Sequence, residues 1–205
     1  YLYYIPYGDN AGGEGSGVFD IRSIKNDGSG DSQKINNFDL NGSGNSNDLG
    51  FVRLGIDQQN VGWIIAGESD ATTLTIYLGK FNANSSGGAS GKAALGKISI
   101  TGITGLVPAD FANGDLCLDG TGNLYVLANN GSNATRIFQI KKADLTTAVS
   151  ANSLSHVTPM KFVALAQQTN GSGLSGNANG LAFSSTGNLY LSTNNKIYFI
   201  TAGSF

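Results

Sequence analysis

The chain is poor in the residues that most often carry chemistry. Its 205 residues include one cysteine, one histidine, one methionine and one tryptophan, and 13% of the residues are charged. The single cysteine, Cys117, excludes an internal disulfide framework. The single histidine, His156, excludes a two-histidine metal site and a catalytic triad with a spare base. No window approaches 18 consecutive apolar residues, so the sequence predicts no membrane span.

Charge is also balanced. Twelve basic and fourteen acidic residues give a net charge of -2. There is no basic run, so we expect no nucleic-acid partner.

Thirty glycines and many Asn, Ser and Thr residues make up much of the sequence. This neutral, amide- and hydroxyl-rich composition favours an extracellular or cell-surface protein, while 40% apolar residues are enough for a folded core. Tyr1 stands in an apolar run, which we interpret as a processed or truncated end.

An internal repeat is the most informative feature. Residues 116–130 read LCLDGTGNLYVLANN and residues 181–195 read LAFSSTGNLYLSTNN, which match at eight of fifteen positions without a gap. Weaker copies precede them at an offset of 62. One domain over 1–205 is therefore expected, with approximate repeats 1–48, 49–113, 114–177 and 178–205.

Each repeat alternates short apolar runs with turns rich in Gly, Asp and Asn, which predicts antiparallel strands. A single helical turn near 142–148 is the one exception that we expect. The predicted strands are a first strand at 51–57, 115–119 and 180–184; a second at 1–7, 61–67, 123–129 and 188–193; a third at 17–22, 73–79, 135–141 and 196–201; and a fourth, more polar one at 33–38, 95–100 and 160–165.

Four antiparallel strands per repeat, none able to bury its face alone, are typical of β-propeller blades. The strings GDLCLDGTGNLYVLANN and GLAFSSTGNLYLSTNN also resemble blades of gluconolactonase-like and related secreted bacterial propellers. The resemblance implies a sheet turn and a fold, but no reaction. The predicted fold is thus an all-β, propeller-like array of about 3.5 blades, incomplete or open.

The strand count gives 3 + 4 + 4 + 3 strands, because the first repeat lacks strand one and the last lacks strand four. Either the chain is a piece of a larger propeller, or another chain completes its open sheet edges. Unpaired edges invite pairing. A protein partner, or self-association through these edges, is therefore expected.

Asp57, Asp119 and Ser184 recur at one repeat position, at the end of strand one. Two readings stay open. The carboxylates could bind Ca²⁺ at a channel mouth, or they could cap a turn before the following glycines. The Ser at the third position favours the turn cap, so no metal site is predicted with Ca²⁺ kept as the alternative.

Aromatic side chains recur at the third position of strand two, at Tyr3, Trp63, Tyr125 and Tyr190. Because they share one register, we expect them to pack between neighbouring repeats. Cys117 lies between two leucines and is expected to be a packed, inert thiol. His156 is expected in a solvated loop. The glycine-rich loops 9–15 and 26–31 lack the carboxylate spacing of a calcium loop.

No catalytic residue is predicted. The leading hypothesis is a non-catalytic binding, adhesion or assembly module. A Ca²⁺-dependent lactonase- or sugar-dehydrogenase-like enzyme is the first alternative, with a ligand set drawn from Glu68, Asp70, Asp57, Asp119, Asn129, Asn130, Asn194 and Asn195. A carbohydrate-binding module is the second, weakened because most aromatics lie on strands rather than at loop tips.

Overall fold

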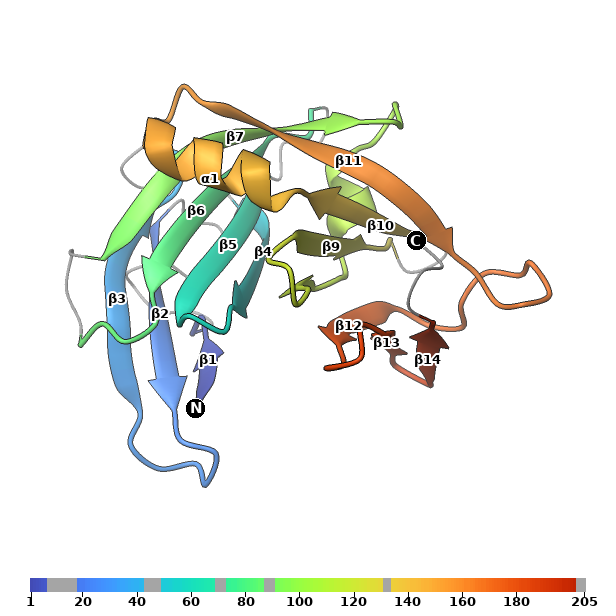
Figure 1. Ribbon diagram of the computed structural model, residues 1–205, viewed down its shortest axis with the longest axis horizontal. Helices are drawn as coiled ribbons and strands as arrows, with labels where there is room; N and C mark the ends of the chain where they lie inside the picture. The colour runs from blue at the N-terminus through green and yellow to red at the C-terminus, as the bar shows by residue number, and fades with distance from the viewer. Residues whose placement is uncertain (7–17, 43–48, 69–72, 87–90, 131–133, 202–205) are drawn as a thin grey trace.

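The computed structural model describes residues 1–6, 18–42, 49–68, 73–86, 91–130 and 134–201. It confirms the all-β prediction (Figure 1). The strands are Leu2–Tyr4 (β1), Val18–Ile24 (β2), Ser32–Asp39 (β3), Leu49–Ile56 (β4), Val61–Glu68 (β5), Ile76–Asn82 (β6), Lys92–Thr101 (β7), Leu116–Leu118 (β8), Leu124–Ala128 (β9), Thr135–Ile140 (β10), Val157–Ala166 (β11), Ala178–Phe183 (β12), Leu189–Thr193 (β13) and Ile197–Ile200 (β14).

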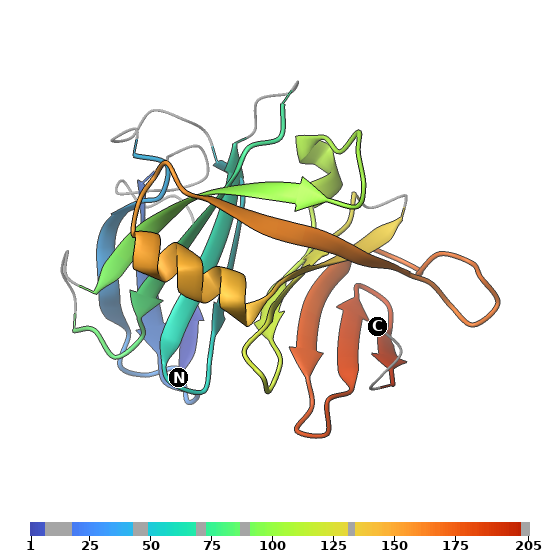
Figure 2. The same ribbon diagram turned by 45° about the horizontal axis from the view of Figure 1, so that its top comes forward.

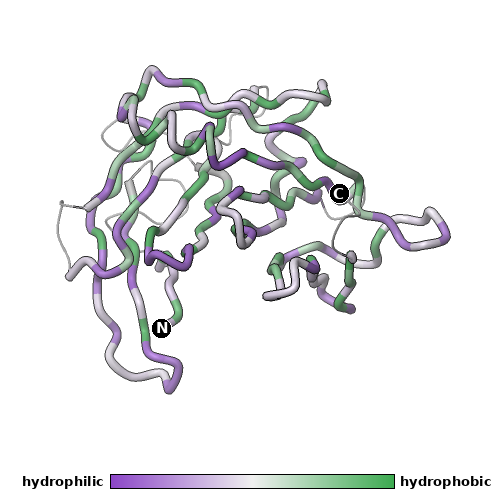
Figure 3. Tube along the Cα trace, viewed as in Figure 1, coloured by the Kyte–Doolittle hydropathy of each residue, from purple (hydrophilic) through white to green (hydrophobic). Residues whose placement is uncertain are grey.

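The strands form three sheets, ordered β1-β2-β3, β4-β5-β6-β7-β11-β10-β9-β8 and β12-β13-β14. Within each sequence repeat, consecutive strands pair antiparallel as a meander. Figure 2 shows the four meanders following one another in chain order from the N-terminal to the C-terminal sheet. In Figure 3, hydrophobic stretches follow the strands, and hydrophilic ones gather in the connections.

The middle sheet differs from a set of separate blades. The fourth strands of two repeats, β7 and β11, pair in parallel, with Lys97 to Thr101 opposite Val157 to Lys161. Eight strands thereby join into one curved, nearly closed sheet, whose end strands β4 and β8 approach each other. A Cβ at Gly55 would lie 3.1 Å from the Leu116 carbonyl oxygen. Pairing two open edges satisfies their backbone groups, which explains why the middle repeats share a sheet. Among the described residues, the predicted array of separate four-stranded blades is therefore not seen.

Three hydrophobic cores lie between successive meanders. The first joins the β1–β3 sheet to β5 and β6, the second fills the interior of the eight-stranded sheet, and the third joins β9 and β10 to the β12–β14 sheet. Phe19, Phe81, Phe138 and Leu191 are among their fully buried members. Each meander is thus stabilised by the next one along the chain, as burial of apolar surface requires.

The repeated aromatics occupy unequal surroundings. Trp63 and Tyr125 are 8% and 6% exposed, in the second and third cores. Tyr3 is half-buried against the first core. Tyr190 is 42% exposed, because no meander follows the last sheet in the described structure. Packing between repeats therefore holds for three positions and not for the fourth.

A helix is longer than the single turn predicted. Helix α1 spans Lys142–Ala151, and a short 3-10 helix spans Pro108–Phe111. The helix contacts β7 and β11, and buries Leu145 and Ala148 in the second core. The Asn123 side-chain oxygen accepts a hydrogen bond from the Lys142 N–H, which satisfies one free donor of the first turn. Because the helix buries only two residues, its hydrophobic pattern is too weak to be predicted from the sequence.

Candidate functional site

Three equivalent turns begin at Asp57, Asp119 and Ser184. In each, the N–H of the first residue donates to the carbonyl four positions later, and the N–H three positions later donates back. The fourth residue of each turn has a positive φ: 60° at Asn60, 91° at Gly122 and 81° at Gly187. Glycine and asparagine tolerate that region of φ, which explains the repeated Gly or Asn in the sequence.

The first side chain of each turn also accepts hydrogen bonds from the turn itself. The Asp57 carboxylate accepts from the N–H groups of Gln59 and Val61, at 2.9 and 2.8 Å, and from the Trp63 indole at 3.3 Å. Ser184 Oγ accepts from the N–H groups two and four positions on. These contacts are those of a turn cap.

Asp119 makes the fullest set of contacts. Its Oδ1 accepts from Thr121 N, Thr121 Oγ1 and Asn123 N at 2.8–2.9 Å, and its Oδ2 accepts from Asn123 Nδ2 at 2.8 Å. Burial would raise the pKa of Asp119, but the hydrogen bonds from Asn123 and Thr121 outweigh it and hold the pKa below its usual value. Asp119 is therefore an anion at neutral pH, with its lone pairs directed into the turn.

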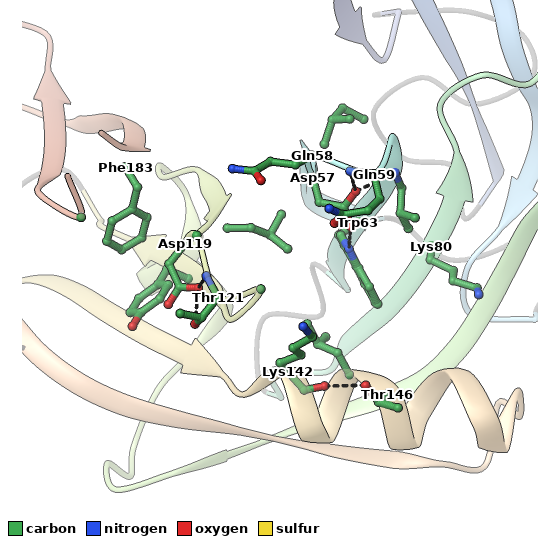
Figure 4. Close-up of a pocket in the computed structure, with 18 of the residues that line it drawn as sticks. Asp57, Gln58, Gln59, Trp63, Lys80, Asp119, Thr121, Lys142, Thr146 and Phe183 are labelled. Atoms are coloured by element: carbon green, nitrogen blue, oxygen red, sulfur yellow. Dashed lines mark hydrogen bonds between the residues drawn. The ribbon is translucent and has the colours of Figure 1, made fainter. Parts of the chain in front are cut away.

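A cavity of about 910 Å³ lies where the three turns converge (Figure 4). This volume is in the range of small-molecule pockets. Three repeats and helix α1 contribute to its wall, which makes it a shared site rather than a property of one repeat. The lining comprises Ile56, Asp57, Gln58, Gln59, Val61, Trp63, Lys80, Leu118, Asp119, Gly120, Thr121, Gly122, Tyr125, Lys142, Leu145, Thr146, Val149, Phe183, Ser184, Ser185 and Gly187.

Aromatic rings form part of this wall. Trp63 lies at the start of β5, and Figure 4 shows its indole facing the cavity between the Asp57 turn and helix α1. On the opposite side, the rings of Tyr125 and Phe183 meet edge-on, with centroids 4.9 Å apart. Burial raises the pKa of Tyr125, and the Asp119 carboxylate raises it further. The phenol therefore stays neutral, and its oxygen accepts a hydrogen bond from Gln139 at 2.6 Å.

Polar groups at the cavity are balanced in charge. The lining includes the cations Lys80 and Lys142 and the anions Asp57 and Asp119, so two cations offset two anions. Gln58 and Gln59 are exposed, and Figure 4 shows Gln58 extending from its turn toward the facing turn of Asp119. Because the charged groups of the lining offset one another, the amides and hydroxyls are the polar groups that the cavity offers to a ligand.

In the part of the chain that the structure describes, the donors suggested for Ca²⁺ do not assemble into one site. Asp57 and Asp119 lie at the turn end of the strands, whereas Asn129 and Asn194 follow the other ends of β9 and β13. Asn129 is buried and donates to Thr135 Oγ1 at 2.8 Å. Ca²⁺ needs six to eight oxygens around one point, and the aspartate oxygens already accept turn hydrogen bonds. Among the described residues, no group of three or more His, Cys, Asp or Glu side chains could hold a metal.

The other predicted candidates lie elsewhere. Cys117 is a half-buried free thiol packed against the third core, and burial raises its pKa above the usual value. His156 is half-buried, in the turn before β11, and its carbonyl accepts from Lys97 N. The loop 26–31 is the β2–β3 hairpin, stabilised by hydrogen bonds from Ser29 to Asp27. Loop 9–15 and Asp70 lie outside the described residues, as does the side chain of Glu68.

Sequence reasoning missed several lining residues. Gln58 corresponds to Gly120 and Ser185 at the repeat offsets, so the alignment of turns could have included it. Lys80, Lys142 and Thr146 come from β6 and α1, outside the repeat turns. Their contribution depends on how the meanders stack, which no local pattern specifies.

No protein family, curated protein sequence or solved structure matches this chain. The resemblance to gluconolactonase-like propellers therefore stays a prediction. Across the described residues, no helix is long and apolar enough to cross a membrane.

Proposed function

We propose that this protein is a non-catalytic binding module that holds a neutral carbohydrate in the cavity between its repeat turns. The observation that carries the proposal is the convergence of three equivalent turns on one cavity of about 910 Å³. A secreted or cell-surface location fits the neutral, amide-rich composition. The repeats correspond to propeller blades in this proposal, with β4, β8 and β12 as the inner strands.

The chemistry of the lining favours this ligand class. Saccharides present hydroxyl groups together with apolar ring faces, and the cavity offers the Gln58 and Gln59 amides beside the Trp63 ring. The balance of two lysines against two aspartates gives no net charge to attract an ionic ligand. In the sequence, the position of most aromatics on strands counts against carbohydrate binding. In the structure, strand β5 brings Trp63 to the cavity wall.

Binding to an array of neutral and acidic oligosaccharides tests the proposal, with calorimetry on each saccharide that binds. We expect a neutral saccharide to bind, and Gln58→Ala to weaken it by about tenfold, the effect of losing roughly 1.4 kcal/mol of hydrogen bonding. Gln58 is exposed, so this change should leave the fold intact.

Gln167→Ala is the matched control, because Gln167 is also exposed but lies outside the cavity. Equal affinity of the Gln58→Ala and wild-type proteins, or binding only to acidic saccharides, would refute the proposal. Titration with Ca²⁺ separates it from the alternative enzyme: tight Ca²⁺ binding lost in Asp57→Asn would favour the enzyme.

A further inference from the structure

The aromatic rings that line the cavity belong to different repeats. Trp63 lies on β5 of the second repeat, and Phe183 ends β12 of the last repeat. Both rings line the cavity, and Figure 4 shows them on opposite sides of it, with Lys142 and Thr146 of α1 on a third side. A ligand that contacts both rings must therefore cross the cavity.

One strand separates the two rings. Strand β8 contacts both β4 and β12, so it lies between them. The three strands end at one repeat position, which is Ile56, Leu118 and Phe183 in turn, and all three side chains line the cavity. Neighbouring strands are about 5 Å apart, so the ends of β4 and β12 lie on the order of 10 Å apart. Two linked sugar rings bridge such a distance, whereas one does not.

Both rings are held in place by contacts within the protein. The Trp63 indole N–H donates to the Asp57 carboxylate at 3.3 Å. The Phe183 ring meets the Tyr125 ring edge-on, with centroids 4.9 Å apart. Side chains that are already fixed lose little conformational entropy when a ligand binds. The cavity therefore presents two preorganised apolar surfaces to a ligand.

Each ring also has a polar side chain near it in the sequence. Gln58 and Gln59 precede Trp63, and Ser185 follows Phe183; all three are exposed and line the cavity. The cavity volume of about 910 Å³ is near the upper end of the range for drug-sized ligands, about 300–1,000 Å³. A monosaccharide is smaller than such ligands. The cavity thus has the size and the paired apolar and polar groups for two sugar units.

We infer that the cavity binds a neutral saccharide of at least two linked sugar units, with one unit against Trp63 and the next against Phe183. This inference rests on the proposed function and adds the length of the ligand to it. A monosaccharide contacts one ring and leaves the other in water. Affinity should therefore rise by roughly tenfold from the monosaccharide to the disaccharide.

Calorimetry with neutral mono-, di- and trisaccharides of glucose, mannose, galactose, xylose and N-acetylglucosamine tests this length dependence. Phe183→Leu keeps an apolar side chain but removes the aromatic face. It should weaken disaccharide binding by about fivefold and leave monosaccharide binding unchanged. Phe199→Leu is the matched control, because Phe199 is an aromatic residue of the same sheet, is 55% exposed and lies outside this cavity.

Hydrogen exchange of the wild-type protein gives a second test that needs no variant. A disaccharide should slow amide exchange in both turns, at 57–61 and at 184–188, whereas a monosaccharide should slow it at 57–61 alone. The inference is wrong, and the proposed function stands, if monosaccharides bind as tightly as disaccharides or if a bound disaccharide protects one turn only. Equal weakening of both ligands by Phe183→Leu has the same meaning. If none of these saccharides binds, the proposed function itself fails.

Discussion

A single carboxylate can stabilise a repeat turn in a pH-dependent way. Asp119 accepts four hydrogen bonds within its turn, and its pKa lies below the usual value. We expect Asp119→Ala to lower the free energy of unfolding at pH 7 by about 1–2 kcal/mol, through the loss of these bonds. Urea denaturation measures the change.

The sign of the pH dependence follows from the lowered pKa. The stabilisation is complete above the unfolded-state pKa of about 3.9 and is lost as pH falls through the folded-state pKa. The difference between wild type and Asp119→Ala should thus be constant above roughly pH 5 and shrink in more acidic solution. Ser184→Ala is the matched control, because Ser184 caps the equivalent turn of the last repeat with a neutral hydroxyl. A difference for Asp119→Ala that stays constant down to about pH 2–3 would contradict the argument.

At this scale the turn residues could be predicted from the sequence. The spacing from Asp57, Asp119 and Ser184 to Asn60, Gly122 and Gly187 encodes a local backbone shape, because only Gly and Asn fit the positive φ readily. What the turns surround could not be predicted. The cavity also needs Lys142 and Thr146 from α1, and their position depends on contacts between distant segments.

At the scale of elements, Gly79 in β6 allows two meanders to pack closely against each other. A Cβ at Gly79 would collide with the side chains of Leu40 and Phe38, which belong to the first meander and its core. Alanine in place of glycine would stabilise the folded protein by about 0.4–1 kcal/mol, because it lowers the conformational entropy of the unfolded chain. Overpacking, however, costs about 1–3 kcal/mol. We expect Gly79→Ala to destabilise the protein by about 1–2 kcal/mol in thermal or urea unfolding.

Gly173→Ala provides the comparison. A Cβ at Gly173 would meet no atom within 4 Å, and its φ is not positive. This variant should be as stable as the wild type or slightly more stable. If Gly79→Ala proved equally harmless, the first meander could not pack against β6 as closely as the structure places it.

Most strands could be predicted because alternation and turn residues are local signals. The parallel pair of β7 and β11 could not, since their partners are some 60 residues apart (Lys97 opposite Val157) and either strand reads as an ordinary edge. Helix α1 was underestimated for a related reason. Its stability depends on Leu145 and Ala148, which pack into a core built by other elements. Two buried residues give only a weak helical periodicity of hydrophobic positions.

For the whole molecule, a carboxylate connects the segment that begins β8 with strand β12 of the last sheet. Asp115 Oδ1 accepts from Leu116 N at 2.8 Å, and Oδ2 accepts from Leu181 N in β12 at 2.9 Å. Burial raises the pKa of Asp115, which the two backbone hydrogen bonds and nearby Arg53 oppose. Together with the Tyr125–Phe183 contact, this hydrogen bond helps attach the last sheet to the rest.

The last sheet is less extensively attached to its neighbour than the two middle meanders are to each other, because the middle meanders share both a core and the β7–β11 strand pair. We therefore expect the molecule to open from its C-terminal sheet. Leu191 is fully buried in the third core, and Leu191→Ala should remove about 2–5 kcal/mol of local stability. Hydrogen exchange in β12–β14 should accelerate, while β5 and β6, separated from that sheet by a whole meander, keep their protection.

Phe138→Ala is the opposite case. Phe138 is fully buried in the second core, with the rings of Phe111 and Phe162 5.6 and 5.8 Å away. Its loss creates a cavity between both middle meanders, so exchange in β5, β6, β9 and β10 should accelerate together. If Leu191→Ala accelerated β5 and β6 as much as β13, the four meanders would unfold as one unit, because stability would then be shared by the whole chain rather than by neighbouring repeats.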